Sequence, residues 1–179
     1  PPSALAFVVY ISLLSSASGT LSPAEQTALQ AWLAGGGTLI VTADIFPLPA
    51  YESFTSFLGV SGYIATSGPS PAVTVGAHPI TAGVATAAFT TNSRFTFPGT
   101  AQRLMDDGAA NVFCVVMDQS TGFAGPGRVV VFGDHNMFTN TFIGQADNTV
   151  LAQNLIQWAK PPGVIWGSFD GTRVNYAGG

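Results

Sequence analysis

The sequence predicts an α/β domain with parallel strands, and three neighbouring segments are the evidence for it. Residues 4–11 and 38–42 are short, continuous apolar runs rich in β-branched and aromatic side chains, which is typical of strands buried on both faces. Between them, residues 23–34 carry apolar side chains at helical spacing. A strand, a helix and a second strand within about 40 residues form a βαβ unit, whose strands run parallel with a right-handed crossover.

The start and the end of this helix are marked by residues with known capping roles. Ser22 can cap the first turn, Pro23 suits the first helical position, and Glu25 completes a capping box with Ser22. Three consecutive glycines, residues 35–37, follow the last apolar position and end the helix. We therefore expect the helix to lie between these two signals.

The rest of the chain predicts shorter elements and a final helix. Residues 128–134 are the clearest late strand, and a helix is expected from about Asp147 to Ala159, before the Pro-Pro pair that breaks it. At this length we expect one domain, residues 1–160, followed by a tail, residues 161–179. The other expected elements are a short helix at 51–58 and strands at 72–75, 94–97, 102–105, 112–117 and, in the tail, 164–166.

Composition excludes several classes of protein. Charged residues are 8% and hydrophobic residues 47% of 179, which is the opposite of a disordered chain. Five Lys and Arg with a formal net charge of -4 exclude a nucleic-acid binder, because phosphates need many basic contacts. The longest apolar run, residues 4–14, is shorter than the ~20 residues of a membrane-spanning helix, so no membrane insertion is expected. The scarcity of Lys and Glu predicts an extracellular, cell-surface or periplasmic location.

Four segments in the right order resemble the class I glutamine-amidotransferase-like family. Residues 21–37 (LSPAEQTALQAWLAGGG) resemble its capped helix, residues 78–84 (HPITAGV) its H-P-I-T-x-G turn, residues 127–134 its last core strand and residues 147–159 its closing helix. The resemblance covers residues 8–159 and is nearest to the non-catalytic branches of that family. It implies a three-layer α/β/α sandwich with a mainly parallel central sheet, of the flavodoxin-like type.

Two departures from the family pattern bear on this resemblance. The first strand and helix of the family are not present upstream of residue 4. Either the chain is a fragment, or the tail supplies an extra strand. Because an unpaired strand edge invites pairing, we expect residues 164–166 to pair with this sheet or with a neighbouring chain.

The second departure is chemical. Active amidotransferases carry a nucleophilic Cys on a tight, glycine-flanked turn, together with a late His and an acidic residue. Here the single cysteine, Cys114, lies in the middle of an apolar strand, residues 42–44 occupy the place of the turn, and the late His-x-Glu pair has no match. We therefore predict no catalytic residue, no cofactor and no metal ligand, and a buried Cys114.

A polar crevice is the remaining candidate site. Asp44 follows one predicted strand, and Asp134, His135 and Asn136 follow another. In open α/β sheets ligands bind beyond the carboxyl ends of the strands, so these four side chains could converge there and suit a hard cation such as Ca²⁺. The alternative interpretation is that Asp134 braces a loop by accepting backbone N–H bonds. His78 has the same two interpretations, a general base or a turn-shaping residue.

These observations predict a non-enzymatic structural or protein-interaction domain of an exported or cell-surface bacterial protein, which could self-assemble. The expected partner is a protein or identical subunits, contacted through the N-terminal strand and the C-terminal tail. Two alternatives stay open: a hydrolase using Asp44, Asp134 and His135, and a carbohydrate- or small-ligand-binding module. An Asp44–Asp134 separation above about 10 Å would exclude the hydrolase.

Overall fold

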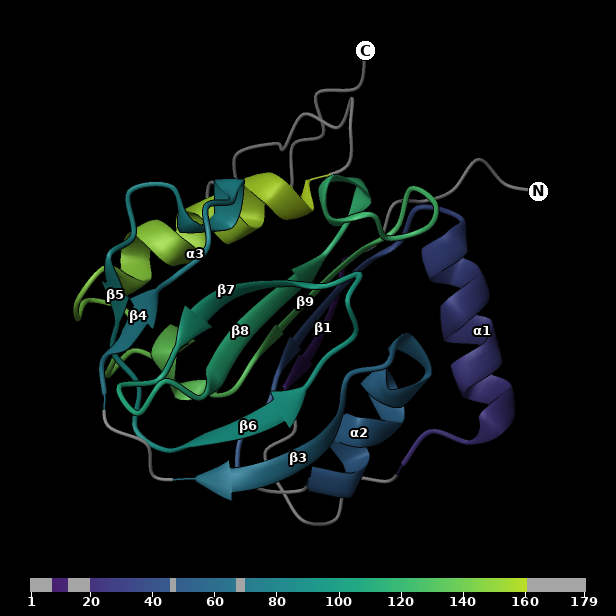
Figure 1. The fold of residues 1–179 in the computed structure, drawn as a ribbon, viewed down its shortest axis with the longest axis horizontal. Coiled ribbons are helices and arrows are strands. Elements are labelled where there is room, and N and C mark those ends of the chain that lie inside the picture. The colour runs from purple at the N-terminus through teal and green to yellow at the C-terminus, as the bar shows by residue number, and fades with distance from the viewer. Residues whose placement is uncertain (1–7, 13–19, 46–47, 67–69, 161–179) are drawn as a thin grey trace, which may run out of the picture.

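The computed structural model describes residues 8–12, 20–45, 48–66 and 70–160. Its main sheet has seven strands in the order β1-β2-β9-β8-β7-β4-β5 (Figure 1). A second, two-stranded sheet pairs β3 with β6. The strands are β1 (Val8–Ser12), β2 (Thr38–Thr42), β3 (Ser61–Thr66), β4 (Ala72–Thr74), β5 (Thr86–Ala87), β6 (Asn92–Thr96), β7 (Gln102–Asp106), β8 (Val112–Met117) and β9 (Arg128–Phe132).

The helices are short. The capped helix is confirmed as α1 (Pro23–Ala34), with Ser22 accepting from the Glu25 backbone N–H and Glu25 accepting in return from the Ser22 backbone N–H. The final helix is confirmed as α3 (Asn148–Ala159), and the short helix is α2 (Leu48–Thr55). The single-turn helices are η1 (Ser56–Leu58), η2 (Pro79–Thr81), η3 (Gln119–Thr121) and η4 (Asn136–Phe138).

The predicted flavodoxin-like, three-layer sandwich with a mainly parallel sheet is wrong. Only β1, β2 and β9 pair in parallel; every pair from β9 to β5 is antiparallel. The described fold is mainly β, a mixed and curled sheet of the half-barrel kind with three short helices (Figure 1). The physical reason is the connection between β7 and β8, residues 107–111, because so short a link can join only antiparallel strands.

Alternate residues of the central strands face two separate apolar clusters. On β2, Leu39 and Val41 pack in the cluster that contains Leu33 of α1, whereas Ile40 packs in the cluster that contains Leu151 of α3. All five residues of β2 are buried, as the continuous apolar run predicted. This two-sided burial fixes β2 and β9, and with them the position of the residues that follow each strand.

Two other expectations concern the ends of the chain and the membrane. The predicted tail strand at residues 164–166 lies outside the described residues. Among the described helices, none has the length and hydropathy that crossing a bilayer requires.

Candidate functional site

The pairing of β2 with β9 brings the predicted crevice residues together. The two strands are parallel and in register from Thr38–Arg128 to Thr42–Phe132, so each ends at the same level. Asp44 lies two residues beyond β2, and Asp134 lies two residues beyond β9. One potential ligand atom from each of Asp44, Asp134 and His135 lies within 4.8 Å of the other two. Asp44 and Asp134 are therefore closer than the separation of about 10 Å above which a shared site would be excluded.

Asp134 is completely buried and is held by N–H donors. Its Oδ2 accepts from the Thr90 backbone N–H at 3.1 Å, and its Oδ1 accepts from the backbone N–H of Asn136 at 2.9 Å and from its side-chain amide at 3.0 Å. Burial raises the pKa of Asp134, and the negative charge of Asp44 acts in the same direction, against these hydrogen bonds. These hydrogen bonds agree with the interpretation that Asp134 braces the loops around it.

Asp44 and His135 form a close pair at the rim. His135 Nδ1 lies 2.8 Å from Asp44 Oδ2, and each side chain is about one-sixth exposed or less, at 14% and 16%. The other oxygen of Asp44 accepts from the Ile45 backbone N–H at 2.6 Å and from the Thr91 hydroxyl at 3.4 Å. Asp44 Oδ2 therefore faces the imidazole ring directly, while Oδ1 is the oxygen that accepts hydrogen bonds from the described residues.

Asn136 orients Asp134 through hydrogen bonds. Its backbone N–H and side-chain amide bond Asp134, and the amide also donates to the Thr90 hydroxyl at 3.2 Å. The predicted convergence of four polar side chains is thus what the structure shows. Whether they catalyse or bind anything stays a prediction.

Residues before and within β6 complete the site, and the sequence analysis missed them. The Ser93 hydroxyl donates to the Asp44 carbonyl at 2.7 Å, and the Ser93 N–H donates to the Gly133 carbonyl at 2.8 Å. A Cβ atom on Gly133 would lie 2.4 Å from the Ser93 carbonyl oxygen, so only glycine permits this approach. Gly133 in the sequence could have indicated that another backbone segment packs closely against this position, but it does not identify that segment.

His78 belongs to a second cluster, which ties three elements together. Its Nδ1 accepts from the Ile80 N–H at 3.2 Å, which leaves Nε2 as the donor to Asp118 Oδ2 at 3.1 Å. The Trp158 indole N–H donates to the same oxygen at 3.0 Å. Burial alone would raise the pKa of Asp118, but the hydrogen bonds from Ser120, Trp158 and His78 outweigh it and lower the pKa to about 2.

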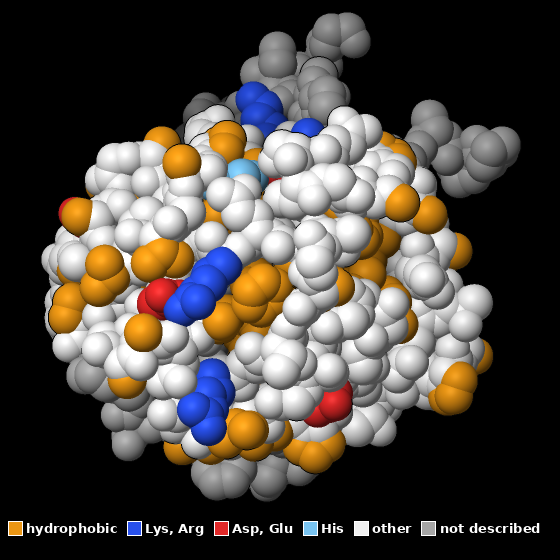
Figure 2. Space-filling model, viewed as in Figure 1, with side chains coloured by type: hydrophobic (Ala, Val, Ile, Leu, Met, Phe, Trp, Pro, Cys, Tyr) orange, Lys and Arg blue, Asp and Glu red, His pale blue; other side chains and the backbone are white. Residues whose placement is uncertain are grey.

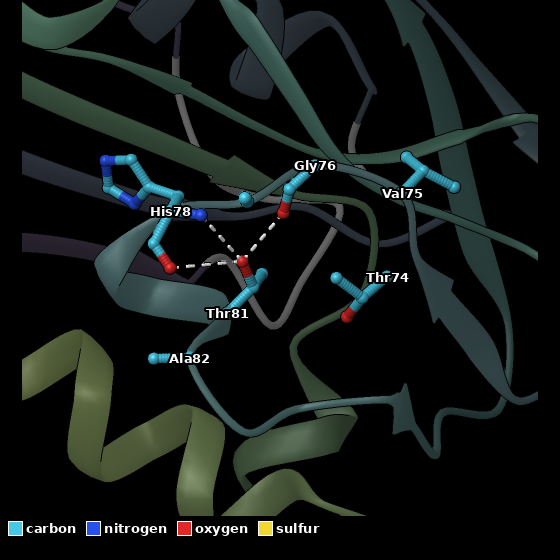
Figure 3. Close-up of a pocket in the computed structure, with 7 residues that line it drawn as sticks. Thr74, Val75, Gly76, His78, Thr81 and Ala82 are labelled. Carbon is cyan, nitrogen blue, oxygen red and sulfur yellow. Dashed lines mark hydrogen bonds between the residues drawn. The ribbon is translucent and has the colours of Figure 1, made fainter.

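The cluster lies beside a shallow hollow of about 470 Å³ formed by residues 74–78 with Thr81 and Ala82. Thr81 is one of the lining residues, and its hydroxyl donates to the Gly76 carbonyl at 2.8 Å and accepts from the His78 N–H at 3.2 Å (Figure 3). The ring of His78 points away from Thr81 in this view. The geometry favours the turn-shaping interpretation of His78 over a general base, because both ring nitrogens already have partners.

Cys114 is fully buried in β8, and burial raises the pKa of its thiol well above the ordinary value. A buried, protonated thiol is a poor nucleophile. We expect the native protein to react with a thiol reagent such as DTNB at least about 100-fold more slowly than the urea-unfolded chain, because reaction requires opening of the sheet. Equal rates in the native and unfolded states would contradict this.

Most of the exposed large hydrophobic side chains of the described residues lie on or next to β4 and on α3, on the opposite flank of the domain from α1 (Figure 1). The described residues have five exposed large hydrophobic side chains, and four of them lie on or next to β4 and on α3: Val73, Val75, Val150 and Ile156. The sequence has no Asp, Glu, Lys or Arg from Ser53 to Ser93 or from Asn148 to Ala159. Helix α3 contacts β5 and η2, and β5 pairs with β4, so these elements form one flank (Figure 1). Figure 2 shows hydrophobic atoms scattered along that edge.

Comparison with known proteins places the fold but not the activity. No curated protein sequence matches the chain. The solved mmIFT52 N-terminal domain aligns with a TM-score of 0.63 and 14% identity, over 82% of this chain and 75% of that one. The cytoplasmic protein STM3548 from Salmonella typhimurium aligns with a TM-score of 0.58 and 15% identity, over 78% of this chain and 61% of that one. At such identities the likeness concerns the fold alone.

The family match corrects the predicted relationship. The resemblance to glutamine-amidotransferase-like and flavodoxin-like proteins is wrong, since the sheet is mixed and curled and the sequence matches another family. The four segments that suggested it are local helix, turn and strand patterns, which many folds share. Residues 9–156 match DUF4350, a domain of unknown function, and the chain belongs to that family.

Proposed function

We propose that this domain is a non-enzymatic interaction module that associates with a second copy of itself through the flank formed by β4 and α3. The observation that supports it is that four of the five exposed large hydrophobic side chains of the described residues, Val73, Val75, Val150 and Ile156, lie on or next to β4 and on α3. Single exposed hydrophobic residues are common, but a group of them marks an interaction site.

Charge explains why a second copy is the occupant. In a twofold dimer the same patch is used by both copies, so a charge close to the twofold axis would meet its own like charge. Strand β4 and helix α3 themselves carry no charged residue, and Asp147 and Lys160 flank the two ends of α3. The low charge of the chain as a whole, 8%, supports the same proposal and also supports placing the domain in an exported or cell-surface protein.

The inert thiol supports a non-enzymatic role. Cys114 is inside the sheet and unavailable for nucleophilic catalysis. Cysteine-dependent catalysis is therefore not open to this domain, and function depends on the site and not on the fold.

The test is the oligomeric state of the full chain over a range of concentrations, measured by sedimentation velocity. We expect a concentration-dependent dimer, and we expect Ile156→Ser with Val75→Ser to weaken it at least about tenfold, because each side chain loses its share of buried apolar area. Ile64→Ser is the matched control, since Ile64 is 50% exposed on β3, close to the 54% of Ile156 on α3.

Two outcomes would contradict the proposal. A monomer at every concentration would exclude self-association. An equal loss of dimer in the Ile64→Ser control would show that the interface lies elsewhere.

A further inference from the structure

The crevice at the ends of β2 and β9 has the composition and the spacing of a metal site. It contains two carboxylates and one imidazole, from Asp44, Asp134 and His135, with ligand atoms within 4.8 Å of one another. The two strands that present them are buried on both faces, so the backbone beneath the three ligands is fixed. A rigid scaffold under the ligands is what metal sites require.

An independent observation points to a ligand in this crevice. His135 Nδ1 is fully buried and makes no hydrogen bond of acceptable geometry, although Asp44 Oδ2 is only 2.8 Å away. A buried polar atom that makes no hydrogen bond costs free energy, and native proteins contain few such atoms. A cation bound by both atoms would satisfy the nitrogen and the oxygen together.

The carboxylates are oriented by bonds that leave ligand positions open. Asp44 Oδ1 is occupied by Ile45 and Thr91, whereas no hydrogen bond is made to Oδ2 within the described residues. Asp134 Oδ2 accepts one hydrogen bond, from Thr90, and a carboxylate oxygen has two lone pairs. Second-sphere hydrogen bonds of this kind orient metal ligands in proteins.

The mixed ligand set identifies the class of metal. Calcium takes six to eight oxygen ligands, whereas zinc accepts three protein ligands of mixed nitrogen and oxygen type and keeps a fourth position for water. Zinc ligands at about 2.0–2.1 Å from the ion lie about 3.4 Å apart in a tetrahedron. The Nδ1–Oδ2 pair at 2.8 Å would open by about half an ångström, which a small rotation of the two partly exposed rim side chains supplies.

We propose that Asp44, Asp134 and His135 bind one divalent transition-metal ion of the zinc class. The site is separate from the flank formed by β4 and α3, so it neither requires nor excludes self-association. Water would complete the coordination, and the ion would link the ends of β2 and β9.

The test is isothermal titration of metal-stripped protein with Zn²⁺ alone, with Ca²⁺ as the second arm. We expect one saturable Zn²⁺ site and no competition by equal Ca²⁺. His135→Gln and Asp44→Asn should each weaken binding at least about tenfold. Both side chains lie at the rim and bear little of the core, so circular dichroism should show folded variants.

The chain offers a matched control, because it contains two histidines. His78 also pairs with a carboxylate, Asp118, at 3.1 Å. Among the described residues, however, this pair has no third side chain close enough to form a metal site with it. His78→Gln should leave Zn²⁺ affinity unchanged. Direct evidence comes from NMR, in which the ring signals of His135 and not of His78 should shift on adding Zn²⁺.

Three results would overturn the proposal: absence of stoichiometric Zn²⁺ binding, unchanged affinity in both His135→Gln and Asp44→Asn, or binding of Ca²⁺ in preference to Zn²⁺. If adding Zn²⁺ shifted only the NMR ring signals of His78, the metal would bind at His78 instead of His135, and the proposal would also be overturned.

Discussion

Replacing Asp134 by alanine is expected to lower the free energy of unfolding by about 3 kcal/mol. The side chain is completely buried and accepts from the backbone N–H groups of Thr90 and Asn136. Alanine would leave both groups without an acceptor, and each unsatisfied buried group costs about 1–3 kcal/mol. Burial also raises the pKa of Asp134, so removing the carboxylate recovers part of its desolvation cost, which keeps the expected loss below the sum of the two penalties.

Urea denaturation in the presence of a chelator measures this loss without a contribution from metal. Asp147→Ala is the matched control, because the Asp147 carboxylate also accepts two backbone N–H bonds, from Ala85 and Thr86, but is only partly buried. Water can replace those two bonds, so the control should lose clearly less stability. Equal losses in the two variants would show that burial of Asp134 is not the source of its effect.

Local features of the chain were predictable because neighbouring residues determine them. The capping box of Ser22 and Glu25 forms as expected, since both partners lie within one helical turn. That Asp44 could meet Asp134 was also predicted, on the condition that their two strands are neighbours. The structure meets this condition, because β2 and β9 pair in parallel and end at the same level.

Strand direction beyond β9 was not predicted, although the information was present. Residues 107–111 form a turn in which Asp107 accepts from the backbone N–H groups of Ala109 and Asn111, and this turn makes β7 and β8 a hairpin. The family resemblance implied parallel strands here, whereas this short link permits only antiparallel ones. Strand β3 was missed for another reason: Ser61–Thr66 has only one buried residue, so it lacks a periodic apolar pattern.

The contacts that complete the crevice could not be read from sequence at all. Thr90, Thr91 and Ser93 reach Asp44 and Asp134 across more than 40 positions in the chain. Two of these contacts use backbone groups or backbone acceptors, which every residue has, so no side-chain pattern marks them.

Replacing Asp118 by asparagine is expected to lower the free energy of unfolding at pH 7 by about 2 kcal/mol, and the deficit should shrink in acid. The pKa of Asp118 is about 2 in the folded protein, against an ordinary value of 3.8. Since the folded state favours the ionised carboxylate, its contribution is fully present above the ordinary pKa and is lost as pH falls from about 4 towards 2. The difference between the two pKa values corresponds to about 2 kcal/mol.

The measurement is urea denaturation of wild type and Asp118→Asn at pH 7, 5 and 3. The deficit should be equal at pH 7 and 5 and clearly smaller at pH 3, because wild type then loses what the variant already lacks. Thr55→Val is the control: its buried hydroxyl bonds the Val60 carbonyl and Tyr63, neither of which titrates in this range, so its deficit should not change with pH. If the stability deficit of Asp118→Asn stayed constant or grew at pH 3, ionised Asp118 would not be what holds His78 and Trp158 in place. The packing of their two rings, whose centroids lie 5.9 Å apart, would then be the source of this order.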